Sequence, residues 1–118
     1  SATERLRGVS WSNEIDQPGN EIVSALLDTL LHDQNVNVRL AAVDALRRFS
    51  AQDSVRKGTV QALADAASSP LVQVALIDFM VETKDTEAVA TLRRISRDSM
   101  VNEAVRGRAV QGLERLGS

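Results

Sequence analysis

The sequence predicts an all-α domain of stacked helical pairs, from its composition, its apolar spacing and an internal repeat. Hydrophobic residues make up 43% and charged residues 25% of the 118 residues, which is a globular composition and not a disordered one. Only 3% of residues are aromatic, so the core must come from Ala, Val, Leu and Ile. Apolar residues recur at helical spacing, and no segment alternates as a half-buried strand does.

The chain repeats itself at intervals of 34 and 33 residues. Residues 38–46 align with residues 72–80 and again with residues 105–113. Three columns of this alignment stay apolar, namely Val38/Val72/Val105, Val43/Ile77/Val110 and Leu46/Met80/Leu113. A repeat of this length indicates a row of similar supersecondary units that bury their apolar faces on one another. Leu46 is therefore expected to be buried between its own unit and the next.

Residues 20–50 form the first predicted repeat. Asn20 is the expected N-cap of the first helix, after the turn at Pro18-Gly19. The second helix is expected to run from the cap residue Asn35 to about Phe49. The first helix carries two apolar stripes at i, i+4 and i+8, made by Ile22, Leu26 and Leu30 and by Val23, Leu27 and Leu31.

Residues 53–84 form the second predicted repeat. Its first helix is expected over residues 54–67, with Val60, Leu63 and Ala67 facing inward. Ser69-Pro70 places a cap residue before a proline at the first helical position, where the missing N–H costs nothing. The second helix is expected to run through Lys84.

Residues 85–117 form the third predicted repeat. Asp85 is expected to cap a helix whose apolar face is Ala88, Val89, Leu92 and Ile95. A loop through residues 98–100 leads to a second helix over residues 102–116, which Gly117 closes.

An N-terminal half repeat is expected over residues 3–12. Residues 5–9 align with residues 39–43, so residues 3–12 are predicted to be the second helix of a truncated unit. The whole chain, residues 1–118, is then a single domain.

The segment over residues 33–46 reads D-Q-N-V-N-V-R-L-A-A-V-D-A-L. It resembles the second half of a HEAT-type repeat, closest to the short variety of phycobilisome-lyase-type HEAT-like proteins. The third repeat meets the pattern in part with Val105-Arg106, Ala109 and Leu113, and the second departs from it with Gln73 and Phe79-Met80. The resemblance covers residues 20–117. It implies a right-handed α-α superhelix, a HEAT-like solenoid of about three helical pairs plus the N-terminal half repeat.

A second resemblance rests on residues 5–11, R-L-R-G-V-S-W, together with residues 35–49. This combination resembles the C-terminal HEAT-like region of bacterial membrane proteins that begin with a zinc-finger anti-sigma segment. The resemblance implies a bacterial sensory or adaptor module. The compartment stays open between cytoplasm and periplasm.

The resemblance also implies roles for particular side chains. In HEAT-like stacks, residues at the positions of Asp33, Arg39, Gln73 and Arg106 form a structural ladder between repeats, although Arg39 and Arg106 could also anchor a partner. The favoured function is a protein–protein interaction scaffold or adaptor, because the second helices of such pairs line a concave surface. The columns of that surface are Asn37, Leu71 and Ala104; Ala41, Ala75 and Arg108; Asp44, Asp78 and Gln111; and Arg48, Glu82 and Arg115.

Nucleic-acid binding is the alternative, as in HEAT-like DNA repair glycosylases. Its footprint would be arginines, namely Arg39, Arg47, Arg48, Arg106 and Arg108. The net charge of −2, the acidic neighbours and the few stacking aromatics count against it. No apolar run reaches the length of a membrane span, so no membrane insertion is expected.

Catalysis and metal or cofactor binding are not expected. The chain has no cysteine, and its single histidine, His32, has only Asp28 four residues before it, which is too small a set of ligands for a stable zinc site. Asp44 and Asp78 share a repeat column, but no base, nucleophile or phosphate-binding loop accompanies them. An unexplained bound metal or cofactor would revive the enzyme interpretation.

The half repeat leads to a first prediction. Removal of residues 1–14 should uncover the stripe of Leu26 and Leu30, because terminal units of a solenoid cover the apolar face of their neighbour. The melting temperature should fall, or the protein should self-associate, as measured by thermal unfolding and size-exclusion chromatography. If both stay unchanged, the domain begins near Asn20.

Overall fold

The computed structural model describes residues 19–65 and 69–117, and every regular element in these ranges is a helix. The prediction of an all-α fold is therefore confirmed. The predicted half repeat at residues 3–12 lies outside the described residues. Six α-helices are described, namely α2 (Asn20–His32), α3 (Val36–Leu46), α4 (Asp53–Ala64), α5 (Pro70–Glu82), α6 (Val89–Arg97) and α7 (Glu103–Arg115), with 3₁₀ turns at Arg47–Phe49 and Thr86–Ala88.

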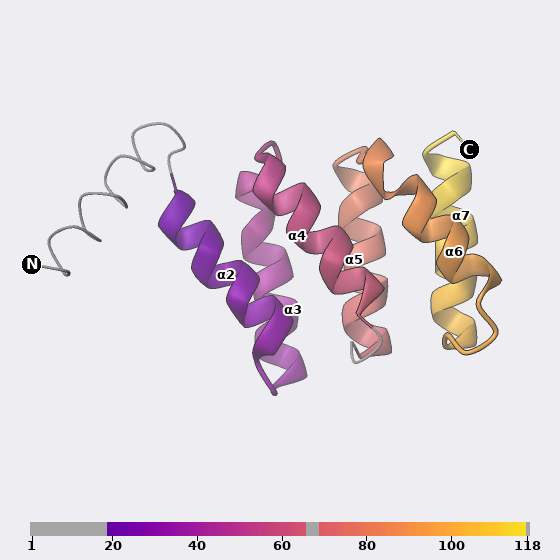
Figure 1. The fold of residues 1–118 in the computed structure, drawn as a ribbon, viewed down its shortest axis with the longest axis horizontal. Helices are drawn as coiled ribbons and strands as arrows, with labels where there is room; N and C mark the ends of the chain where they lie inside the picture. The colour runs from indigo at the N-terminus through magenta and orange to yellow at the C-terminus, as the bar shows by residue number, and fades with distance from the viewer. Residues whose placement is uncertain (1–18, 66–68, 118) are drawn as a thin grey trace, which may run out of the picture.

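The helices are stacked as pairs in two layers (Figure 1). The first helices, α2, α4 and α6, pack in sequence in one layer, and the second helices, α3, α5 and α7, pack in sequence in the other. Each first helix also packs on the second helix of its own pair. This is the arrangement of a HEAT-like α-α repeat, and the right-handed sense of the superhelix stays a prediction.

Helix caps recur in register with the repeat. The side chains of Asn35, Ser69 and Asn102 cap α3, α5 and α7 in turn. Asn35 Oδ1 accepts a hydrogen bond from the backbone N of Asn37 at 2.8 Å, and Asn102 Oδ1 accepts one from Ala104 at 2.9 Å. Each cap satisfies backbone donors that the first turn leaves unpaired. The caps therefore start each second helix at the same point of the repeat.

The predicted N-cap of α2 is wrong. Gly19 occupies that position, and Asn20 is already the first helical residue. The φ angle of Gly19 is 83°, in the left-handed region that favours glycine. A Cβ on Gly19 would lie 2.5 Å from Cε1 of Phe49, so the ring covers this turn closely. The backbone turn at Gly19, and not a polar side chain, starts the helix.

Two helices also end earlier than predicted. The helix α4 ends at Ala64 and not at residue 67, because Asp65 has the extended backbone angles φ −71° and ψ 117°. The helix α5 ends at Glu82 and not at Lys84, whose φ of 55° is left-handed. Such a residue cannot continue a right-handed helix.

One apolar core runs through all three pairs. Leu46 and Met80 are fully buried, and so is Ile77, as their repeat columns predicted. Val110 occupies the column of Ile77 but is 45% exposed, because no further repeat follows α7 in the described residues. Packing between successive pairs, and not within one pair, therefore completes the burial of these columns.

Asp85 is a buried carboxyl at the junction between the second and third repeats. Its Oδ1 accepts a hydrogen bond from the backbone N of Glu87 at 3.0 Å and so caps the turn Thr86–Ala88 that leads into α6. Its Oδ2 is buried and accepts no hydrogen bond from the described residues. Burial raises the pKa of Asp85, although its backbone hydrogen bonds oppose the change.

The core yields a second prediction. Leu46→Ala should lower the free energy of unfolding by about 2–5 kcal/mol, because it removes three side-chain carbon atoms from a filled site and leaves a cavity. Chemical denaturation measures the loss. Ile22→Ala, at a leucine-sized side chain that is 57% exposed, is the control and should cost much less. A loss below about 1 kcal/mol for Leu46→Ala would contradict the assigned register.

Asp85 yields a third prediction. Because its pKa is higher in the folded chain, its ionised form destabilises the fold at neutral pH, and protonation relieves this as the pH falls. The stability of Asp85→Asn relative to the wild type should therefore decrease between about pH 7 and about pH 4. Denaturation curves across this range measure the difference.

The matched control is Asp98→Asn. Asp98 is exposed but makes the same local contact, since its Oδ1 accepts from the backbone N of Met100 at 2.9 Å. The difference in free energy of unfolding between Asp98→Asn and the wild type should change less with pH than the corresponding difference for Asp85→Asn. Equal pH dependence in both variants would overturn the assignment to burial.

Candidate interaction surface

The eleven predicted partner-binding residues all lie on the layer of second helices, on α3 and the turn after it, on α5 and on α7. Ala75 and Asp78 are half-buried, and the other nine are exposed. These nine are Asn37, Ala41, Asp44, Arg48, Leu71, Glu82, Arg108, Gln111 and Arg115. All eleven are thus accessible in part, and their role in binding stays a prediction.

Ion pairs join successive second helices across this surface. Arg47 Nε lies 2.9 Å from Glu82 Oε2, and the same guanidinium lies 2.9 Å from Asp44 Oδ1, so α5 is linked to the end of α3. Arg108 lies 3.3 Å from Asp78 Oδ1, which links α7 to α5. The hydrogen bond from Arg47 lowers the pKa of Glu82, as expected for a paired carboxylate. Exposed pairs of this kind stabilise by about 0–1 kcal/mol each.

Asp44 and Asp78, which share a repeat column, each contact a different arginine. Their ion-pair partners are therefore basic side chains, as is usual for structural carboxylates on a helix surface. The geometry gives no support to a pair of carboxylates that shares a proton.

Arg47 links two repeats, a role that the sequence pattern did not predict. Its partner Glu82 lies 35 residues on, one residue past the repeat interval, so the pair runs diagonally between columns. The one signal of this pair in the sequence is that the acidic Glu82 lies next to the position that aligns with Arg47 in the following repeat.

Two of the predicted ladder residues, Arg39 and Asp33, form hydrogen bonds within their own repeat. Arg39 is only 8% exposed, and its Nε donates to the carbonyl oxygen of Leu30 at 2.8 Å, near the end of α2. Asp33 Oδ1 accepts a hydrogen bond from the backbone N of Asn35 at 2.8 Å. Gln73 is 8% exposed, and the buried Nε of Arg106 donates to no acceptor among the described residues. The ladder between repeats stays a prediction.

His32 and Asp28 are both exposed, with His32 Nε2 3.9 Å from Asp28 Oδ1. The described part of the chain contains no group of three or more His, Cys, Asp or Glu side chains arranged to hold a metal ion. None of the described helices is long and apolar enough to cross a membrane.

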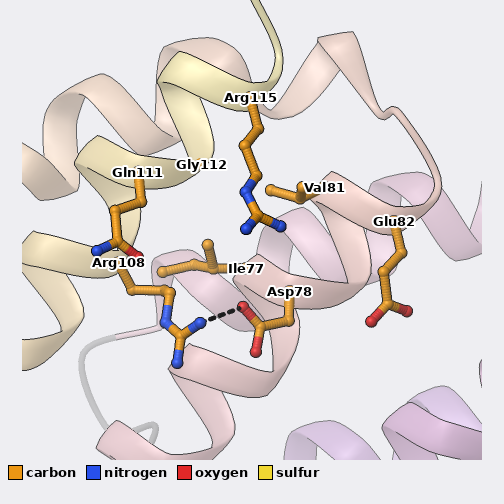
Figure 2. Close-up of a pocket in the computed structure, with 8 residues that line it drawn as sticks. All are labelled: Ile77, Asp78, Val81, Glu82, Arg108, Gln111, Gly112 and Arg115. Atoms are coloured by element: carbon orange, nitrogen blue, oxygen red, sulfur yellow. Dashed lines mark ion pairs between the residues drawn. The ribbon is translucent and has the colours of Figure 1, made fainter.

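A pocket of about 210 Å³ lies between α5 and α7 (Figure 2). Its apolar part comes from Ile77 and Val81 on α5 and from the backbone of Gly112 on α7. A Cβ on Gly112 would lie 3.3 Å from methyl carbons of both Ile77 and Val81, so glycine allows α7 to approach α5 closely. Five predicted partner-binding residues complete the lining, namely Asp78, Glu82, Arg108, Gln111 and Arg115.

A second cavity of about 400 Å³ lies on the other side of the repeat junction, around Arg56 and Asp85. Arg56 already lies near two carboxylates there, Asp53 at 3.5 Å and Glu87 at 3.9 Å. None of the predicted partner-binding residues lines the second cavity. The pocket between α5 and α7, which five of them line, is therefore the stronger candidate for a partner.

Residues 22–53 match the family model described as HEAT repeat. The match supports a HEAT-like helical repeat. It spans α2, α3 and the turn that follows, which is the first of the three pairs. No curated protein and no solved structure gave a match. HEAT repeats generally mediate protein–protein interaction as scaffolds and are typically not enzymes.

Proposed function

We propose that this chain is a protein–protein interaction scaffold or adaptor, which binds a peptide or protein on the concave surface lined by its second helices. The match to the HEAT repeat supports the general role. The observation that carries the choice of surface is the accessibility of all eleven predicted residues on α3, α5 and α7. An origin in a bacterial anti-sigma-type membrane protein is part of the same proposal and rests on sequence resemblance alone.

The composition of the surface favours a peptide or a helix as partner. Small side chains such as Ala41 and Ala75 lie among charged ones, so a partner backbone can approach α3 and α5 closely. Leu71, which is 65% exposed, adds apolar area near the start of α5. Apolar contacts surrounded by charged groups are the usual make-up of a protein interface.

Nucleic-acid binding has weaker support, because most of the arginines predicted to contact nucleic acid already interact with other groups of the protein. Arg39 is buried and donates to a backbone carbonyl. Arg47 and Arg108 are paired with carboxylates, which leaves less positive charge for phosphates. The carboxylates on the same surface would also repel a phosphate backbone.

A fourth prediction tests the surface. Peptides selected from a random library against the whole chain should shift backbone amide signals of α3, α5 and α7 in ¹⁵N NMR spectra and leave those of α2, α4 and α6 unchanged. The two helix layers provide the internal control within one experiment. Shifts confined to α2, α4 and α6 would contradict the proposed surface.

The nucleic-acid alternative is tested in parallel. A random-sequence DNA duplex is titrated by fluorescence anisotropy at low and at physiological salt. A scaffold for peptides should show no binding at physiological salt. Binding that weakens steeply with salt would favour nucleic acid instead, because phosphate contacts release counterions.

A further inference from the structure

We infer that the pocket between α5 and α7 recognises a carboxylate of the partner, with Arg115 as the residue that binds it. The occupant is one Glu or Asp side chain of an acidic peptide. The inference rests on the proposed function and narrows it to one chemistry at one place.

Arg115 is the cation of the pocket that has no ion-pair partner in the described part of the chain. Figure 2 shows its side chain extending from α7 toward Ile77 and Val81. It forms no ion pair with any of the described residues, unlike Arg47 and Arg108 on the same surface. Its guanidinium, which can donate two parallel hydrogen bonds to one carboxylate, is therefore available.

The two carboxylates of the pocket are already paired with arginines other than Arg115. Asp78 Oδ1 lies 3.3 Å from Arg108, and Glu82 Oε2 accepts from Arg47 Nε at 2.9 Å. In Figure 2 the carboxylate of Glu82 lies on the side of α5 away from Arg108. A basic side chain entering the pocket would have to compete with these arginines, whereas an acidic one would find Arg115 unpaired.

The size and the walls of the pocket fit a single side chain. Its volume of about 210 Å³ is below the roughly 300–1,000 Å³ of pockets that enclose whole small ligands. Ile77, Val81 and the bare backbone of Gly112 provide apolar contact for the methylene groups of a Glu side chain. Gln111 on the same helix adds an amide that can hydrogen-bond the partner.

The test uses three synthetic peptides that differ at one position, Ac-Ala-Leu-X-Ala-Leu-NH₂ with X as Glu, Gln or Lys. Each is titrated into the whole ¹⁵N-labelled chain while the Nε–Hε signal of Arg115 and the amide signal of Gly112 are followed. The Glu peptide should shift both signals and bind about tenfold more tightly than the Gln peptide. The Lys peptide should bind no better than the Gln peptide.

Two variants make the result specific to Arg115. Arg115→Gln should abolish the preference for the Glu peptide, and Arg115→Lys should keep only part of it because an ammonium lacks the planar fork. Arg94→Gln is the matched control, since Arg94 is also exposed and forms no ion pair among the described residues but lies on α6. It should leave the preference unchanged. Circular dichroism checks that all three variants stay folded.

The inference is overturned if the Glu and Gln peptides bind equally, if the Lys peptide binds best, or if Arg115→Gln keeps the preference. In those cases, shifts that still map to α3, α5 and α7 would leave the proposed function standing. Absence of shifts on all three helices, with these peptides and with the library-selected ones, would overturn both.

Discussion

The fold depends on the burial of small aliphatic side chains between successive helical pairs. With 3% aromatic residues, no single pair has enough large side chains to close a core of its own. Leu46, Ile77 and Met80 are fully buried because the next pair covers them. Val110, in the last described pair, occupies an equivalent position and remains 45% exposed. Packing between successive pairs is therefore a main contribution to stability, as in other stacked repeats.

Stacking also decides which surface groups meet. The side-chain caps start the second helices at the same point of each repeat, so the exposed columns of α3, α5 and α7 lie in parallel rows. Gly112 then lets α7 approach α5 until methyl groups of Ile77 and Val81 limit the contact. The pocket forms because α7 contacts α5 at Gly112, which has no side chain. Longer side chains, such as that of Arg115, line the space beside this contact.

Sequence alone predicted what depends on short-range patterns. Helical periodicity and the caps at Asn35 and Ser69 are local signals, and the structure agrees with them. The start of α2 at Gly19 was missed because a left-handed backbone angle, and not a capping side chain, determines it. The pair of Arg47 with Glu82 was missed because it depends on how far one helix is rotated against the next. The rotation of one helix against the next follows from core packing. It cannot be read from the residue types in the columns of the repeat alignment.

The separation between core and surface explains how a single repeat plan produces different surfaces between successive second helices. The core columns keep apolar residues, whereas one surface column changes from Arg48 through Glu82 to Arg115. Between α3 and α5, this change brings Glu82 to Arg47, and the groups pair with each other. Between α5 and α7, the described carboxylates that line the pocket with Arg115 are already paired with other arginines. Because exposed pairs contribute little to stability, the surface charges can vary at little cost to the fold, and this freedom is what the proposed carboxylate site between α5 and α7 depends on.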